Sequence, residues 1–196
     1  MITLDDLRAI CVHTKAAHLE PFVEPLNAAM TEFEIDANPA RGTHFLAQVA
    51  HESGGFNYVR ELASGDAYEG RDDLGNTEPG DGPRYRGRGL IQITGRANYQ
   101  SCGDGLGVDL VGEPELLESP ILATRSAGWF WNSRNLNELA DKGDIRAITK
   151  RINGGLNGYQ SRLSYLELAQ RRALPLATLD KELRLAGGKL GIPLLG

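Results

Sequence analysis

One segment carries a complete set of signals for a buried α-helix, and it limits the fold more than any other part of the sequence. Asn38 and Pro39 form a start signal, because an asparagine side chain can cap the first turn and proline is favoured at the first helical position. Apolar residues then recur at helical spacing over positions 45–50. The glycine pair Gly54-Gly55 predicts the end of this helix. The chain must therefore fold around a helix that has one apolar face.

Similar signals recur along the chain and predict a mainly helical domain. Thr3, Ser119 and Asp144 can each cap a helix that begins just after them. A last long helix is expected from about residue 160 to residue 173, with leucines facing inward.

Two segments break the helical pattern. Residues 57–89 are rich in glycine, aspartate and proline, and a loop-rich passage of this length inside a compact domain is usually functional. Residues 90–94 alternate apolar and polar side chains, which predicts a short strand. We therefore expect a mainly α fold, of α+β type, with one small β element beside a loop-lined groove.

The length and composition indicate one globular domain followed by a short tail. A chain of 196 residues with 41% hydrophobic and 24% charged side chains can bury a core without disulfides. We expect a domain over residues 1–174 and a C-terminal tail over 175–196, where leucine, glycine and proline predominate. No run of 18 apolar residues is present, so we expect no stable membrane insertion.

The net charge argues against nucleic-acid binding, and the positions of the two cysteines argue against a disulfide. A net charge of -5 argues against a nucleic-acid binder, which would need a basic surface. Cys11 and Cys102 lie far apart in segments with a helical pattern, and we expect two small buried thiols rather than a disulfide.

Glu52 and Glu61 are the candidate catalytic pair. Cleavage of a glycosidic bond needs one protonated carboxyl group to release the leaving oxygen and one ionised carboxylate to activate water. Glu52 falls in the last turn of the predicted helix, where the partial negative charge of the helix end favours the protonated form by roughly 0.3 to 1 kcal/mol. Partial burial against Phe56 or Tyr58 would act in the same direction. In the inverting geometry the two carboxyl groups lie roughly 6.5 to 9.5 Å apart, with the water between them.

The same residues exclude a metal-dependent alternative. His51-Glu52 begins a pattern found in zinc peptidases, but that pattern needs a second histidine at position 55, which is glycine. His44 and His51 share a helical face without an evident third ligand, and we expect a packed or hydrogen-bonded His51. Acid/base hydrolysis needs no metal or organic cofactor, and we expect none.

Five motifs together resemble glycoside hydrolase family 19, which contains chitinases and the lysozyme-type endolysins of phages. The resemblance covers roughly residues 40–172 in the family's order. The motifs are His51-Glu52-Ser53-Gly54-Gly55-Phe56, Tyr85 to Tyr99, Gly107-Val108-Asp109-Leu110, Ala127-Gly128-Trp129-Phe130-Trp131 and Ile152-Asn153-Gly154-Gly155. The resemblance implies a lysozyme-like arrangement of helices around a substrate cleft.

The resemblance also implies roles for single residues. Glu52 takes the place of the general acid and Glu61 that of the general base, while Thr94 stands where the family holds the attacking water. Glu69 is a rival to Glu61, because the loop after the first glutamate varies in length across the family.

Further positions match residues that line the sugar-binding cleft in the family. They are Gln92, Asn98, Asn153 and Arg162, and Tyr85 begins the segment that forms the cleft floor.

The arginines at positions 84, 86, 88 and 96 leave two alternatives open. They form either a solvated face or a basic rim of the cleft, and we favour a rim that meets the stem-peptide carboxylates of peptidoglycan.

The resulting hypothesis is a phage-type endolysin, a muramidase that cuts between N-acetylmuramic acid and N-acetylglucosamine. Its expected partner is the peptidoglycan strand, and we expect a monomer. The N-terminus lacks the apolar core of a secretory signal, so we expect synthesis in the host cytoplasm and action on the cell wall after release. The alternatives are a chitinase and, from another class, a carbohydrate-binding protein that has lost turnover.

Overall fold

A computed structural model describes residues 1–173, so the tail expected over 175–196 lies outside the described residues. Among those residues the fold is mainly helical, as expected, and no described helix is both long and apolar enough to cross a membrane. The longer helices are α1 (Leu4–Ile10), α3 (Val23–Glu32), α4 (Pro39–Glu52), α6 (Arg96–Leu106), α7 (Pro120–Ser133), α8 (Leu136–Asp141), α9 (Ile145–Asn153) and a final helix of which residues 159–173 are described.

Short helical turns connect these elements. They are α2 (Ala16–Leu19), α5 (Asp81–Arg84) and the 3₁₀ helices η1 (Glu20–Phe22), η2 (Ile35–Ala37), η3 (Asp66–Tyr68), η4 (Asp72–Leu74) and η5 (Pro114–Glu118).

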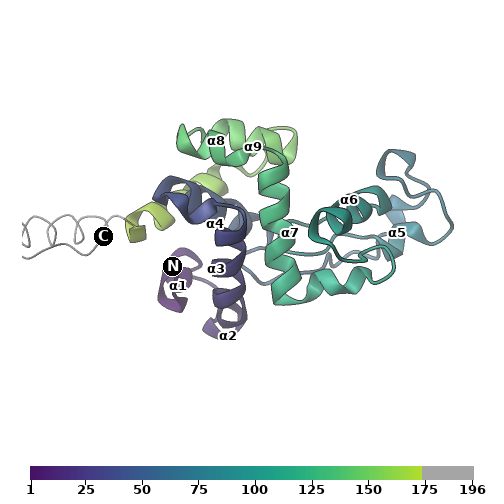
Figure 1. Cartoon of the computed structure of the whole chain (residues 1–196), viewed down its shortest axis with the longest axis horizontal. Coiled ribbons are helices and arrows are strands. Elements are labelled where there is room, and N and C mark those ends of the chain that lie inside the picture. Colours follow the sequence, from purple (N-terminus) through teal and green to yellow (C-terminus); the bar gives the residue numbers. More distant parts are fainter. Residues whose placement is uncertain (174–196) are drawn as a thin grey trace, which may run out of the picture.

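Helix α7 is the central element of the molecule. It packs against α3, α6, α8 and the turn η5. Figure 1 shows α7 standing between the helical part, with α1, α3 and α4, and a second part that holds α5, α6 and long connecting loops. The fold therefore divides into a helical part and a loop-rich part on opposite sides of one helix.

The helix signals of the sequence are confirmed at the residues where they were expected. Asn38 accepts a hydrogen bond from the backbone of Arg41 at 3.0 Å, and α4 runs to Glu52. Ser119 and Asp144 cap α7 and α9 in the same way. Thr3 caps α1 as part of a capping box.

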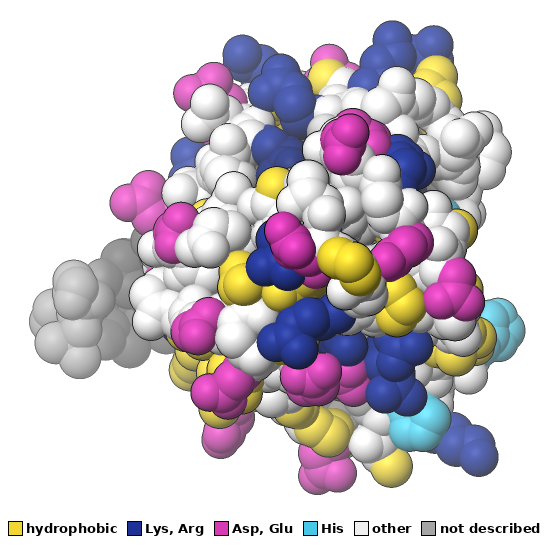
Figure 2. Space-filling view, turned by 90° about the vertical axis from the view of Figure 1, so that its right-hand side faces the viewer, with side chains coloured by type: hydrophobic (Ala, Val, Ile, Leu, Met, Phe, Trp, Pro, Cys, Tyr) yellow, Lys and Arg dark blue, Asp and Glu magenta, His cyan; other side chains and the backbone are white. Residues whose placement is uncertain are grey.

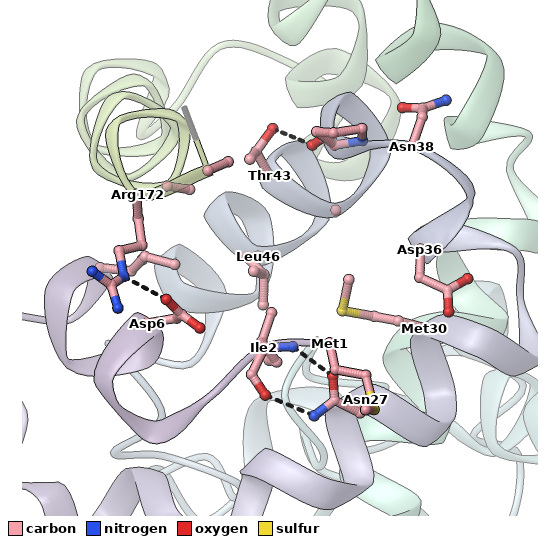
Figure 3. A pocket seen from close by; sticks show the side chains of 15 residues that line it. Met1, Ile2, Asp6, Asn27, Met30, Asp36, Asn38, Thr43, Leu46 and Arg172 are labelled. Atoms are coloured by element: carbon pink, nitrogen blue, oxygen red, sulfur yellow. Dashed lines mark hydrogen bonds and ion pairs between the residues drawn. The ribbon is translucent and has the colours of Figure 1, made fainter. Parts of the chain in front are cut away.

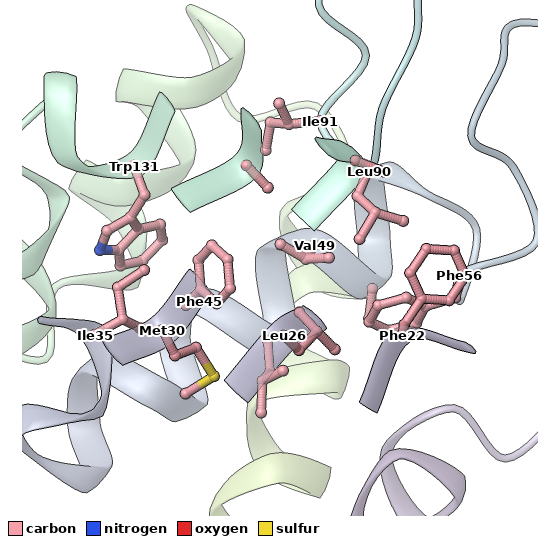
Figure 4. Close-up of a cluster of buried hydrophobic side chains, with 14 of the residues drawn as sticks. Phe22, Leu26, Met30, Ile35, Phe45, Val49, Phe56, Leu90, Ile91 and Trp131 are labelled. Carbon is pink, nitrogen blue, oxygen red and sulfur yellow. The ribbon is translucent and has the colours of Figure 1, made fainter. Parts of the chain in front are cut away.

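One core cluster unites the two parts. Phe45 of α4 packs edge-on against Trp131 of α7, with ring centroids 5.5 Å apart. Val49 of α4 and Leu90 of the loop-rich part are both fully buried in the same cluster, drawn in Figure 4. Leu90 therefore fixes the loop-rich part against the last turns of α4.

The prediction of a strand over residues 90–94 is wrong. The described β structure there is limited to two isolated bridges, Arg60 with Arg88 and Arg88 with Ile93. Gly89 and Gln92 have positive φ angles of 77° and 55°, and the Gln92 amide bonds back to the Gly89 carbonyl at 3.2 Å. The segment folds into a tight turn, because these two residues reverse its direction.

Both cysteines are buried and free, as expected. Burial raises the pKa of the Cys11 thiol and that of the Cys102 thiol to about 12. Neither thiol is therefore ionised near neutral pH.

Buried polar groups hold the loop-rich part together. Asp81 is 2% exposed and accepts hydrogen bonds from Arg96 at 2.8 and 2.5 Å. Arg88 is 3% exposed, donates to Glu118 at 2.8 Å and also donates to the Tyr99 hydroxyl at 3.0 Å. These side-chain contacts hold the loops of this part to α5, α6 and η5.

The Asp81–Arg96 pair makes the stability of this part depend on pH. The hydrogen bonds from Arg96 lower the pKa of Asp81 below its ordinary value. The contribution of the pair is therefore present above an unfolded pKa of about 3.9 and is lost as pH falls through the lower folded pKa. We expect Asp81→Asn to lower the melting temperature at pH 7, and this difference from the wild type to shrink below about pH 4.

Thermal unfolding at pH 7 and at pH 3 measures this difference. Asp73→Asn is the matched control, because Asp73 pairs with Arg71 on the exposed surface, where such pairs contribute little. An equal loss at both pH values in the Asp81 variant would contradict the assignment.

Candidate active site

Glu52 is the last residue of α4 and sits where the chain reverses sharply. The Ser53 hydroxyl donates to the Val49 carbonyl at 2.7 Å and accepts from the Phe56 amide at 2.8 Å. Gly54 and Gly55 both adopt positive φ angles. A side chain at position 55 would also meet a neighbouring hydroxyl at 2.7 Å, so glycine is needed there.

The carboxylate of Glu52 is held by Arg162, which lies on the helix over residues 159–173. One terminal nitrogen of Arg162 donates to Oε1 of Glu52, and the other donates to Oε1 of Gln48 at 2.6 Å. Arg162 is 2% exposed, whereas the side chain of Glu52 is 22% exposed. The guanidinium of Arg162 is therefore covered and contacts Glu52, and its place in the sugar-binding surface stays a prediction.

Arg162 places its positive charge directly against one oxygen of the Glu52 carboxylate. The contact involves Oε1, and no described residue bonds to Oε2. The second oxygen is therefore the one available to a ligand.

His51 is engaged in the structure and is not placed to bind a metal. Its Nδ1 lies 2.9 Å from the Ser161 hydroxyl. Burial and the neighbouring Arg162 lower the pKa of His51, so its ring is neutral near pH 7. Among residues 1–173, no group of three or more His, Cys, Asp or Glu side chains is arranged to hold a metal ion.

Glu61 lies on the segment that pairs with the Tyr85–Thr94 motif. Its backbone amide donates to the Gly87 carbonyl at 2.9 Å. The Gly87 amide in turn donates to Oε2 of Glu61 at 3.1 Å, and the Tyr68 hydroxyl donates to Oε1 at 3.0 Å. Both carboxylate oxygens therefore have one fixed donor.

Gly87 brings three of the expected site residues together. A side-chain carbon at position 87 would lie 2.7 Å from Oε1 of Gln92. It would also lie 3.3 Å from Oε2 of Glu61 and from the Thr94 hydroxyl. These three polar groups therefore converge on one point, and only glycine leaves the space between them open.

Glu69, the other candidate for the base, has its carboxylate bonded to loop backbone amides. Its two oxygens accept hydrogen bonds from the backbone amides of Gly80 and Gly82, at 2.7 and 2.8 Å. The carboxylate thereby closes the loop between η3 and α5. Its position favours a role in loop structure and leaves Glu61 as the carboxylate beside Gln92 and Thr94.

A short connection links the two candidate carboxylates. Residues 53–60 join them, and Phe56 anchors this connection in the core at 3% exposure. Near the end of the connection, the Val59 carbonyl accepts a hydrogen bond at 2.9 Å from the amide of Gly89, which precedes the buried Leu90. Because the connection is fixed at both ends, Glu52 and Glu61 are held in a defined relation to each other.

The remaining expected residues fall into two groups. Asn98 and Asn153 are exposed, and their amides donate to the carbonyls of Thr94 at 2.7 Å and Asn157 at 3.1 Å. Tyr85 is 1% exposed, and its hydroxyl donates to a carbonyl in the loop before η5. The Tyr85 ring therefore packs beneath its segment, and a substrate contact by Tyr85 stays a prediction.

The expected arginine rim is also corrected. Arg88 and Arg96 are paired with Glu118 and Asp81, and Arg84 donates to backbone carbonyls at 3.0 and 2.8 Å. Figure 2 shows the loop-rich end of the molecule, where positive and negative side chains are interspersed rather than gathered by sign. Three of the four arginines therefore stabilise the loops and do not form a surface for acidic peptides.

A prominent pocket lies away from both carboxylates. Figure 3 shows its lining, which comes from α1, α3, the first half of α4 and the end of the helix over 159–173. Its walls include the apolar Ile2, Met30 and Leu46 and the ion pair between Asp6 and Arg172. Neither Glu52 nor Glu61 lines it.

Sequence reasoning missed three residues, namely Tyr68 and Gly87, which bond to Glu61, and Gln48, which shares Arg162 with Glu52. Gln48 lies four positions before Glu52, so helical periodicity places it on the same face and gives a signal that could have been used. Tyr68 and Gly87 reach Glu61 from a loop and from a turn. Their contacts carry no periodic signal in the sequence.

Comparisons with known proteins agree with this architecture. A protein of Haemophilus influenzae described as a glycosyl hydrolase family 19 domain-containing protein is 36% identical over 157 residues, which cover 64% of this chain and 76% of that protein. An endochitinase of Arabidopsis thaliana is 40% identical over 134 residues, and the chain spans 46% of its length.

A solved structure shows the same fold. Chitinase C from Streptomyces griseus HUT6037 superposes with a TM-score of 0.72 at 24% identity, over 86% of this chain and 75% of that one. The family model described as chitinase class I matches residues 29–159, which is more than half of the chain and includes both candidate carboxylates. With its helical architecture and these relatives, the chain belongs to glycoside hydrolase family 19.

Proposed function

We propose that this protein hydrolyses the β-1,4 bonds of a polymer of N-acetylglucosamine, with Glu52 as general acid and Glu61 as general base. One observation carries the proposal. Two partly accessible carboxylates, each held by its own fixed donors, flank a short rigid connection, and the second has Thr94 and Gln92 beside it. An acid and a base with a polar position for water between them are what inverting hydrolysis requires.

Glu52 is suited to the acid role because only one of its oxygens is engaged. Arg162 occupies Oε1, so the proton is carried on Oε2, which is free to face the glycosidic oxygen. The proton moves to that oxygen as the bond to the sugar breaks. Arg162 then stabilises the carboxylate that remains.

Glu61 is suited to the base role because donors face both of its oxygens. The Tyr68 hydroxyl donates to one oxygen and the Gly87 amide donates to the other, so the carboxylate acts as an acceptor toward both. A carboxylate has about four acceptor positions, so lone pairs remain for water. The Thr94 hydroxyl donates to the Gln92 carbonyl at 2.9 Å, and its own lone pairs can hold the same water.

The substrate follows from the relatives and from the loss of the arginine rim. The expectation of a muramidase depended on basic side chains meeting the acidic stem peptides of peptidoglycan. Three of those four arginines are engaged within the protein, and the Arabidopsis thaliana relative is an endochitinase. Both points favour chitin-type polymers over peptidoglycan.

Product analysis tests the substrate. The purified protein is incubated with chitin oligomers and, separately, with peptidoglycan, and the newly exposed reducing sugars are identified by mass spectrometry. We expect N-acetylglucosamine ends from the oligomers and no new muramic acid ends from peptidoglycan. New muramic acid ends, with intact oligomers, would support the muramidase instead, and no cleavage of either would support a binding protein without turnover.

Variants of the three glutamates test the assignment of acid and base. We expect Glu52→Gln and Glu61→Gln each to lower kcat by about 10² to 10⁴-fold, because a positioned acid or base contributes that much. Glu69→Gln should lower kcat far less than either, because Glu69 anchors a loop and the glutamine side chain keeps one of the two acceptor oxygens.

Steady-state kinetics on chitin oligomers measures all three variants, and thermal unfolding verifies that each is folded. Full turnover in Glu61→Gln together with loss in Glu69→Gln would move the base to Glu69.

Arg162 is expected to act by holding Glu52. Arg162→Lys keeps the positive charge but cannot bond to Glu52 and Gln48 with the same planar fork. We expect a kcat lower by roughly 10-fold or more with a KM close to that of the wild type. We also expect a loss of roughly 1 to 3 kcal/mol in the free energy of unfolding, as for a lost hydrogen bond to a charged group.

Enzyme kinetics and urea unfolding measure the two effects. Arg171→Lys is the matched control, because Arg171 lies exposed on the same helix. A wild-type kcat in the Arg162 variant would show that Glu52 does not depend on this contact.

A further inference from the structure

We propose that Tyr68 is a positioning residue for the base: its hydroxyl and the Gly87 amide together hold the Glu61 carboxylate in the orientation that receives the proton from water. The inference rests on the proposed function, because it concerns how the base of that reaction is held. It adds a residue that lies outside the motifs on which the sequence assignment depended.

The contact geometry places Glu61 between two donors from different parts of the chain. Tyr68 ends η3 and donates to Oε1 at 3.0 Å, while the Gly87 amide donates to Oε2 at 3.1 Å. The Glu61 backbone is fixed as well, since its amide donates to the Gly87 carbonyl at 2.9 Å. Without the Tyr68 hydroxyl, one carboxylate oxygen would lose its described donor, and the side chain would be free to rotate about the remaining contact.

Tyr68 is itself held by a buried amide. Asn76 is fully buried and donates from its side chain to the Tyr68 carbonyl at 2.9 Å. The oxygen of the same side chain accepts from the Arg96 amide, at the first residue of α6, at 2.8 Å. Asn76 therefore links the Tyr68 backbone to the start of α6, so the position of Tyr68 is fixed by a helix as well as by its own loop.

Glu69 secures the loop on the other side of Tyr68. Its carboxylate bonds to the amides of Gly80 and Gly82, so the turn that follows Tyr68 is closed onto α5. The residue that rivalled Glu61 for the base thus belongs to the frame that orients the base. A long irregular loop needs such anchors if it is to present one side chain accurately.

The protonation of Tyr68 suits a permanent donor. Burial and the hydrogen bond to the neighbouring Glu61 carboxylate raise the pKa of Tyr68. The phenol therefore keeps its proton over the range in which the enzyme acts. A hydroxyl that stays protonated donates at every turnover and takes no part in the proton transfer itself.

Removal of one hydroxyl tests the proposal. Tyr68→Phe keeps the ring and its packing, and Tyr165→Phe is the matched control, because the Tyr165 hydroxyl makes no hydrogen bond to any residue among 1–173. Kinetics on chitin oligomers gives kcat and KM, and calorimetry gives the Kd of an oligomer. We expect Tyr68→Phe to lower kcat roughly 10- to 100-fold, with KM and Kd within about twofold of the wild type.

Three outcomes of the kinetics separate the alternatives. An unchanged kcat in Tyr68→Phe, with loss in Glu61→Gln, would overturn the role of Tyr68 and leave the base assignment standing. A Kd weakened in proportion to the loss of kcat would overturn it too, because Tyr68 would then contact the substrate. Full activity in Glu61→Gln would overturn the proposed function and this inference together.

A second measurement does not depend on the folding of the Tyr68 variant. The pKa of Tyr68 is followed by NMR of ring-labelled tyrosine in the wild type and in Glu61→Gln. Because the Glu61 charge raises the pKa of Tyr68, we expect a lower value in the variant. The same value in both proteins would show that the two side chains do not interact in solution, and would overturn the proposal.

Discussion

The buried guanidinium of Arg162 is the interaction on which the rest of the site depends. It bonds to Gln48 and Glu52 of α4 from a helix more than a hundred residues later in the chain. A covered arginine needs such acceptors, because an unpaired buried charge is costly. The two helices therefore dock in one register, and that register sets where the Glu52 carboxyl group lies.

The second carboxylate depends on a different kind of support. Glu61 belongs to the loop-rich part, where the buried Asp81, Arg88 and Asn76 side chains bond to loop backbone groups in place of regular structure. Leu90 ties this part to Val49 in the common core (Figure 4). In the site, an ion pair with Arg162 fixes Glu52 at the end of α4. Buried polar side chains fix the loops that hold Glu61. Both supports are needed if a water is to fit between the two carboxylates.

Local signals in the sequence were sufficient for the helices and not for the loops. Asn38 and Ser119 cap helices where expected, because capping depends on residues within one turn. The alternation over residues 90–94 suggested a strand, but the positive φ angles of Gly89 and Gln92 produce a turn. The arginines of this motif have partners far away in the chain, such as Glu118 for Arg88. Charge in the sequence therefore indicated a basic rim, whereas three of its four arginines have partners within the protein.

In the proposed reaction Glu61 activates a water on the far side of the sugar from Glu52, so that hydrolysis inverts the anomeric centre. Proton NMR of chitin oligomers in the first minutes after the enzyme is added measures this directly. We expect the α-anomer of the new reducing end to appear first and then to mutarotate to the equilibrium mixture. Initial release of the β-anomer would mean a retaining reaction, and would contradict the roles given to both glutamates.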